Sequence, residues 1–297
     1  MKILLLGKNG QVGWELQRSL APLGELIALD RNTVNGLSGD LSDLEALRAT
    51  IRQIKPDVIV NAAAYNAVDK AESEPELAHL LNSEAIQVMA EEARGLGAWL
   101  IHYSTDYVFS GQGQSPWRET DAPAPLNSYG VSKLAGERAI QASGCKYLIF
   151  RTSWVYSVRG QNFARTMLRL AKERETLNVI ADQIGAPTGA DLIADVTALA
   201  LHRIIDQPEL SGLYHLAAGG EVSWHDYARD VIGFARTAGE ELAVSTLNPI
   251  DTTAYPAPAR RPLNSRLNTQ KLRDTFSLHL PDWQSGVIRM LREVLNK

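Results

Sequence analysis

The chain has 297 residues, of which 45% are hydrophobic and 22% are charged, as in ordinary globular proteins with a large core. Its net charge of −4 offers no basic surplus for a nucleic-acid partner, and no apolar run approaches the ~20 residues that a membrane span requires. A lone cysteine, Cys145, and an N-terminal apolar run too short for a signal peptide favour a cytoplasmic protein without nucleic-acid or membrane partners.

Short apolar runs alternate with longer segments of helical period through the first half of the chain. Strands are predicted, in chain order, at 2–6, 25–29, 57–61, 98–104 and 146–150. Helices are predicted between them at 11–22, 43–54, 76–95 and 129–142. This alternation is typical of a doubly wound parallel sheet with helices on both faces, so we predict an α/β, Rossmann-like domain over residues 1–155.

The alternation becomes less regular in the second half. The elements expected there are an amphipathic helix at 162–175, a strand at 177–180 and helices at 190–205, 223–237 and 283–295. We interpret residues 156–297 as a smaller, mainly substrate-binding lobe, from which some segments return to the first domain. No stretch reads as a flexible linker between the two.

The segment GKNGQVG joins the first predicted strand to the first predicted helix. Its glycines, Gly7, Gly10 and Gly13, allow a sharp turn, bring backbone N–H groups against a pyrophosphate and let the helix pack closely on the strand. The second strand leads into Asp30, seventeen residues after Gly13, where a carboxylate can accept hydrogen bonds from the adenosine ribose. In this context the loop predicts a dinucleotide site rather than a glycine turn without a ligand.

The residues around Asp30 leave the choice between NADH and NADPH open. A carboxylate at Asp30 disfavours a 2′-phosphate, whereas Arg31 and Lys8 are able to bind one. Asp40 follows a plausible strand and can accept a bond from the adenine amine, with Leu41 packing on the ring.

Three alanines, in VNAAAYNAVD, follow the strand predicted at 57–61. Small side chains there would let a cofactor lie against the backbone, although an alanine run also suits helix or core packing.

Tyr129 and Lys133 lie four residues apart at the start of a predicted helix, so both side chains can reach one spot. An ammonium beside a phenol stabilises the phenolate and makes the phenol a better proton donor or acceptor at neutral pH. The strand before them delivers Ser104 and Thr105 to the carboxyl edge of the sheet, where a hydroxyl can hold a substrate oxygen. On its own the Tyr-x-x-x-Lys pair also fits a solvated helix face.

These motifs, together with NAAAYNAVDKAESEP, STDYVFSG, RTSWVYS, DQIGAPT and RRPLNSRLN, resemble the extended short-chain dehydrogenase/reductase family over residues 1 to about 293. The resemblance is most specific to members that reduce a dTDP-linked 4-keto sugar, and it implies hydride transfer from NADH or NADPH to the C4 ketone. It implies that Tyr129 donates the proton, that Thr105 supplies the hydroxyl, and that Lys133 bonds the nicotinamide ribose and lowers the pKa of the phenol.

The resemblance also implies sets of ligand contacts. The implied cofactor contacts are Gly10, Gln11, Val12, Asp30, Asp40, Leu41, Ala64, Tyr65, Asn66, Tyr103, Tyr129 and Lys133. The implied substrate contacts are Thr105, Asp106 and Trp154. Asn66 stands where the family commonly has threonine, and either side chain can form hydrogen bonds.

Trp154 either stacks on a sugar ring or fills the interface between the lobes. Arg260 and Arg261 either clamp a diphosphate or are ordinary surface charges. His102 lies within an apolar strand and is expected to be a core histidine, and no histidine has the spacing of a zinc site.

Some members of the resembled family form homodimers through a magnesium ion held by carboxylates. Glu15, Asp191 and Glu293 fall near those positions, with Asp191 in place of a glutamate.

Two alternative functions remain open at this point. A nucleotide-sugar epimerase or dehydratase of the same superfamily would keep its oxidised cofactor bound through each cycle. A non-catalytic subunit would bind the dinucleotide only, and the intact set of Thr105, Tyr129 and Lys133 argues against it.

Overall fold

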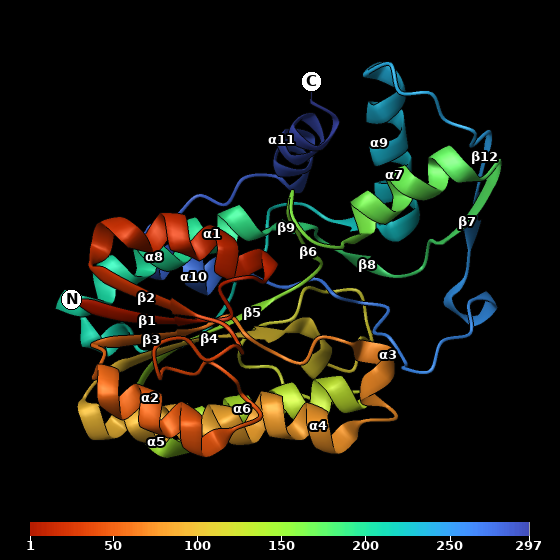
Figure 1. Cartoon of the computed structure of the whole chain (residues 1–297). Helices are drawn as coiled ribbons and strands as arrows, with labels where there is room; N and C mark the ends of the chain where they lie inside the picture. The colour runs from red at the N-terminus through yellow and green to blue at the C-terminus, as the bar shows by residue number, and fades with distance from the viewer. Residues whose placement is uncertain (297) are drawn as a thin grey trace.

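A computed structural model describes residues 1–296. Its centre is a six-stranded sheet in the order β10-β5-β4-β3-β1-β2, in which every pairing is parallel (Figure 1). The strands are β1 (Lys2–Leu6), β2 (Glu25–Leu29), β3 (Val58–Asn61), β4 (Trp99–Thr105), β5 (Lys146–Thr152) and β10 (Gly212–His215). The predicted Rossmann-like α/β class is confirmed.

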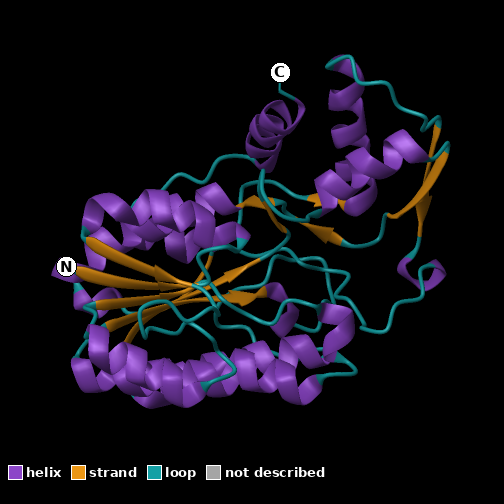
Figure 2. Cartoon of the chain, viewed as in Figure 1, coloured by secondary structure: helices purple, strands orange, loops and turns teal. Residues whose placement is uncertain are grey.

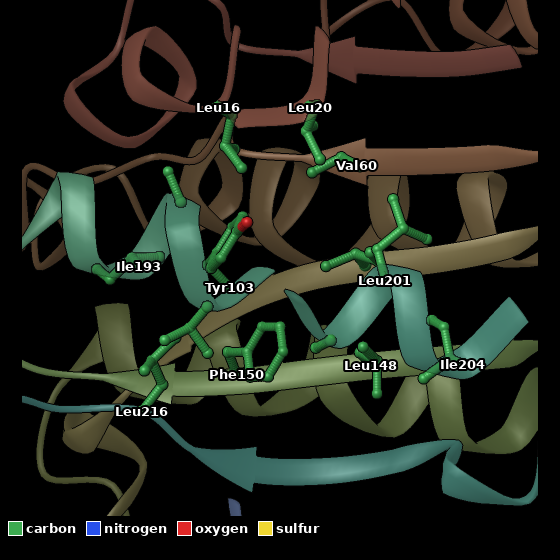
Figure 3. Close-up of a cluster of buried hydrophobic side chains, with 14 of the residues drawn as sticks. Leu16, Leu20, Val60, Tyr103, Leu148, Phe150, Ile193, Leu201, Ile204 and Leu216 are labelled. Carbon is green, nitrogen blue, oxygen red and sulfur yellow. The ribbon is translucent and has the colours of Figure 1, made fainter. Parts of the chain in front are cut away.

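Helices cover both faces of the sheet (Figure 2). One face carries α1 (Gln11–Leu20), α8 (Ala190–Asp206) and α10 (Gln270–Phe276), and the other carries α2 (Leu44–Ile54), α5 (Ala85–Leu96) and α6 (Ser128–Ser143) (Figure 1). On the first face Leu16 and Leu20 of α1 and Leu201 of α8 pack against Tyr103 and Phe150 of the strands (Figure 3). Burying a leucine side chain fully stabilises the fold by about 1.5–3 kcal/mol.

The helix expected at 76–95 is interrupted. It consists of α4 (Pro75–His79), a π-helical turn η2 (Leu80–Glu84) and then α5. The turn carries Asn82, whose Oδ1 accepts a bond from the Tyr65 N–H at 2.9 Å and whose Nδ2 donates to the Tyr65 carbonyl at 3.1 Å. The irregular turn thus fixes the backbone of the loop after β3, and π-helical turns often occur at such functional positions.

The second lobe is built around its own hydrophobic core. Its helices are α7 (Phe163–Glu173), α9 (Trp224–Thr237) and α11 (Trp283–Leu295). Its strand pairs are β7 (Thr176–Ile180) with β12 (Thr246–Ile250), β6 (Val155–Tyr156) with β9 (Thr188–Gly189), and β8 (Ile184–Gly185) with β11 (Val222–Ser223). From this part of the chain α8, β10 and α10 return to the main sheet, and the boundary at residue 155 stays a prediction.

Short elements complete the chain. They are α3 (Val68–Ala71), η1 (Ala21–Leu23), η3 (Asp106–Val108), η4 (Pro208–Leu210) and η5 (Thr252–Ala254). Over residues 1–296, no helix combines the length and apolar character needed to cross a membrane.

The contact between α1 and β1 depends on Gly13. A Cβ atom at this position would lie 2.0 Å from the carbonyl oxygen of Gly7, which is backbone and cannot move aside cheaply. We expect Gly13→Ala to lower the free energy of unfolding by about 1–3 kcal/mol, measured by urea denaturation.

Gly95 in α5 is the matched control, because no atom lies within 4 Å of a Cβ built there. Gly95→Ala should raise stability by up to about 0.5–1 kcal/mol, since alanine favours helix over glycine. Equal effects of the two variants would contradict a packing role for Gly13.

Candidate active site

A cavity of about 380 Å³ lies where the carboxyl ends of β1, β3, β4 and β5 meet the second lobe. Its lining includes the start of α1, the alanine run, the residues that end β4 and β5, the Tyr129 and Lys133 pair, and two tryptophans. Of the predicted site residues, those that line this cavity are Gly10, Gln11, Val12, Ala64, Asn66, Tyr103, Thr105, Asp106, Tyr129, Lys133 and Trp154. A larger cavity of about 960 Å³ beside the second half of α6 contains none of them.

The glycine loop forms a cradle for an anion. Helix α1 begins after Gly10, which has no side chain to accept hydrogen bonds from the first N–H groups of the helix. Such free N–H groups and the helix dipole favour a phosphate. A Cβ atom at Gly7 would lie 2.7 Å from the backbone nitrogen of Ala63, so glycine is required for the close approach of the two loops. The residues present therefore fit the pyrophosphate of a dinucleotide.

The predicted adenosine contacts lie outside this lining. Asp30 accepts bonds from the Asn9 amide and from the Asn32 N–H, the latter at 2.8 Å. Asp40 accepts bonds from the backbone and hydroxyl of Ser42 at 2.9 and 2.7 Å. Leu41 is buried in the core between the sheet and α2. The cofactor roles of Asp30, Asp40 and Leu41 stay predictions.

The loop after β3 carries two predicted contacts beyond Ala64, namely Tyr65 and Asn66, and only Asn66 lines the cavity. Asn66 is exposed and lines the cavity. Tyr65 is buried outside the lining, and its hydroxyl donates to Glu74 at 2.6 Å. The backbone of Tyr65 belongs to the same loop as Ala64 and is held by the Asn82 side chain.

Tyr129 and Thr105 are brought together as predicted. Asn127 caps α6 by accepting a bond from the Gly130 N–H at 2.8 Å, which sets Tyr129 in the first turn of the helix. The phenol of Tyr129 and the hydroxyl of Thr105 line the same cavity. Burial raises the pKa of this phenol, its interaction with Thr105 lowers it by less, and the charge of Asp106 raises it further.

The expectation that Lys133 lowers the pKa of Tyr129 stays a prediction. The Lys133 amino group donates to the carbonyl of Tyr103 at 2.7 Å. Burial lowers the pKa of Lys133 to about 8, against the opposing charge of Glu137 one turn along α6. Because the pKa of the Tyr129 phenol is raised above its ordinary value, this phenol is protonated at neutral pH, which is the state that a proton donor needs.

Asp106 is a second buried titratable group at this site. Its side chain accepts a bond from the Thr105 hydroxyl at 3.1 Å. Burial raises the pKa of its carboxyl to about 7, although bonds from Ser265 and Thr105 oppose the shift. The Thr105 hydroxyl thus interacts with both the phenol and a carboxyl that exchanges a proton near neutrality.

Trp154 forms an aromatic wall with a residue that sequence reasoning missed. Its indole stacks on Trp224 with ring centroids 3.5 Å apart and planes at 13°. A Cβ atom at Gly185 would lie 2.7 Å from the Trp154 ring, so glycine is required there for close packing. Trp154 also has φ +49°, an unusual conformation for a large residue that often marks a functional site. The helix predicted at 223–237 includes Trp224, but the sequence does not show that this residue faces Trp154.

The structure does not bring the two arginines of the expected diphosphate clamp to the cavity. Arg261 is paired with Asp69 at 2.7 Å, and the carbonyl of Arg260 accepts a bond from the Asn127 amide at 2.7 Å. Neither arginine lines the cavity, so the diphosphate clamp stays a prediction.

The magnesium site is not supported. Glu15, Asp191 and Glu293 do line one pocket, but arginines occupy it with them. Arg18 lies 3.7 Å from Glu15, and Arg289 pairs with Asp191 and lies 4.0 Å from Glu293. These arginines neutralise the carboxylates, and among the residues the structure describes no three side chains are grouped to hold a metal ion.

Comparison with known proteins gives one consistent result. The model of the RmlD substrate binding domain family matches residues 1–296. The dTDP-4-dehydrorhamnose reductase of Shigella flexneri is 62% identical over 294 residues, covering 99% of this chain and 98% of that protein.

Two solved structures agree in fold over the whole chain. The dTDP-4-dehydrorhamnose reductase of Bacillus anthracis in complex with NADP is 35% identical with a TM-score of 0.86, covering 99% of this chain and 100% of that one. The dTDP-4-dehydrorhamnose reductase ortholog of Clostridium acetobutylicum is 33% identical with a TM-score of 0.87, covering 100% of both chains. A family match over the full described length and an identity of 62% to one relative show that this chain belongs to the RmlD substrate binding domain family.

Proposed function

We propose that this chain is an NAD(P)H-dependent reductase that converts dTDP-4-dehydro-β-L-rhamnose to dTDP-L-rhamnose, the final step in the synthesis of that nucleotide sugar. The names of its relatives support the substrate. The observation that carries the chemistry is that Thr105, Tyr129 and Lys133 line the same cavity as the start of α1. A homodimer and a cytoplasmic location remain predictions that accompany this proposal.

Residues on both sides of the sheet edge would hold the cofactor. The loop through Gly7, Gly10 and Gly13 would hold the pyrophosphate, Asp30 the adenosine ribose, and Ala64 and Lys133 the nicotinamide half. A reduced nicotinamide supplies a hydride to the ketone when it is bound. The relative from Bacillus anthracis binds NADP, which supports NADPH as one donor for this chain.

The side chains supply the proton and position the oxygen. As negative charge develops on the ketone oxygen, the Tyr129 hydroxyl donates its proton to it, completing the alcohol. In the structure the Thr105 hydroxyl donates to Asp106 at 3.1 Å; with substrate bound, this single O–H would turn to donate to the substrate oxygen beside the phenol. Lys133, as the ammonium, stabilises the phenolate that remains.

Removing the phenolic hydroxyl tests the proton donor. We expect Tyr129→Phe to lower kcat by about 10²- to 10⁴-fold, because the phenol is the group that protonates the oxygen in this proposal. The measurement is the consumption of NADPH with dTDP-4-dehydro-β-L-rhamnose, compared with NADH. Steady consumption also distinguishes a reductase from an epimerase or dehydratase, which regenerates its cofactor.

Tyr147→Phe is the matched control, since Tyr147 lies on β5 outside the cavity lining. Its kcat should stay within a factor of about two of the unmodified chain, as for most changes away from a site. Full turnover in Tyr129→Phe would refute the assigned role.

The aromatic wall is expected to bind the sugar. Trp154→Ala should raise KM by about 2- to 10-fold through the loss of stacking, with a smaller change in kcat. Trp154→Phe keeps an aromatic face and should restore most of the affinity. An unchanged KM in the alanine variant would show that the sugar binds elsewhere.

A further inference from the structure

A chain of buried side chains runs from the alanine loop to Lys133. Asn61 at the end of β3 and His102 on β4 are partners in the register of the sheet. Asn61 Nδ2 lies 3.2 Å from His102 Nδ1, and His102 Nε2 lies 3.3 Å from Lys133 Nζ. All three residues are at most 2% exposed, so none of these groups can exchange its partner for bulk water.

The direction of the first bond is fixed by the backbone. The N–H of Ala63 donates to Asn61 Oδ1 at 3.1 Å, and a backbone N–H can only donate. The other end of the amide is therefore the NH₂ group, which has no lone pair to offer. Asn61 must donate to His102 Nδ1, and Nδ1 must be the unprotonated nitrogen.

The imidazole of His102 is neutral. Burial, and secondarily the charge of Lys133, hold the pKa of His102 well below its ordinary value. A neutral ring whose Nδ1 accepts a bond carries its single proton on Nε2. That Nε2–H faces Lys133 Nζ.

The charge on Lys133 then decides whether this contact is attractive. An ammonium has no lone pair, so two donors would meet at 3.3 Å. A neutral amine accepts from His102 Nε2–H and still donates to the Tyr103 carbonyl at 2.7 Å, which satisfies every member of the chain. The observed contacts correspond to the amine.

We infer that Asn61 and His102 form a latch that favours the neutral amine of Lys133, and that protonation of Lys133 breaks its contact with His102 and frees it to act beside Tyr129. This inference rests on the proposed function, in which the ammonium is the active form. Asn61 and His102 are positioning residues, because they act through Lys133 rather than on the substrate.

Other charged and titratable groups surround Lys133. On α6, Glu137 favours the ammonium, but its carboxylate is shared with Arg151 through bonds of 2.8 and 2.6 Å. Tyr129 and Asp106 line the same cavity as Lys133. None of these groups lies in the Asn61–His102 chain, so the latch can be altered without changing them.

The tautomer of His102 tests the latch without any turnover. In ¹⁵N-histidine-labelled protein, NMR should show His102 as the Nε2–H tautomer, assigned by its absence in His102→Phe and compared with the exposed His79, His202 and His279. Asn61→Asp should convert it to the Nδ1–H tautomer, because a carboxylate accepts where the amide donated. An Nδ1–H tautomer or an imidazolium in the unmodified protein would overturn the inference.

The pH dependence of kcat gives the second test. The ammonium form of Lys133 is lost as pH rises, so kcat should fall on the alkaline side. Asn61→Asp and His102→Phe each remove the donor that favours the amine, and both should move this fall upward by about one pH unit. A merely structural role would lower kcat at every pH without moving the midpoint, and that outcome would refute the latch.

The two tests separate the latch from the reductase activity. If the unmodified chain reduces no dTDP-linked 4-keto sugar, the proposed function fails while the tautomer measurement still decides the latch. If Asn61→Asp and His102→Phe keep the alkaline midpoint of the unmodified enzyme, the latch fails and the proposed function stands.

Discussion

The parallel register of β3, β4 and β5 is the constraint on which the site depends. Strand β3 ends at Asn61, which lies opposite His102 of β4. The residues of β4 after His102 therefore extend beyond the end of β3 and carry Thr105 to the cavity. Thr105 pairs with Thr152 of β5, so the next strand reaches the same level. A slip by one residue would turn every side chain to the opposite face and remove both His102 and Thr105 from their positions.

Burial of Lys133 is the costly part of this arrangement. An isolated buried ammonium is unfavourable unless hydrogen bonds and opposite charge compensate for lost water. The Tyr103 carbonyl supplies the bond, while Glu137 supplies charge that Arg151 largely neutralises. The compensation is incomplete, which is why the pKa of Lys133 falls to about 8 and its protonation becomes sensitive to a single neighbour such as His102.

Sequence predicted the parts of this fold that local signals specify. The strands of the first domain, the glycine turn and the Tyr129–Lys133 helix follow from periodicity, glycine spacing and the i, i+4 rule. The four-residue β10 was missed because its residues join the sheet only by pairing with β5. Trp224 and the arginine beside Asp191 were missed for the same reason: their neighbours, Trp154 and Asp191, are distant in sequence. The direction of the pKa shift of Tyr129 could not be predicted, since its largest cause is burial, which depends on the tertiary fold.

One physical cause acts on the two titratable groups that flank Tyr129, with opposite results. Burial raises the pKa of Asp106 to about 7 and lowers that of Lys133 to about 8, because it disfavours whichever form is charged. A carboxyl and an amine thus both change charge within a narrow interval around neutrality, on either side of a phenol that stays protonated. Opposite shifts of this kind are how a single fold assigns acid and base roles.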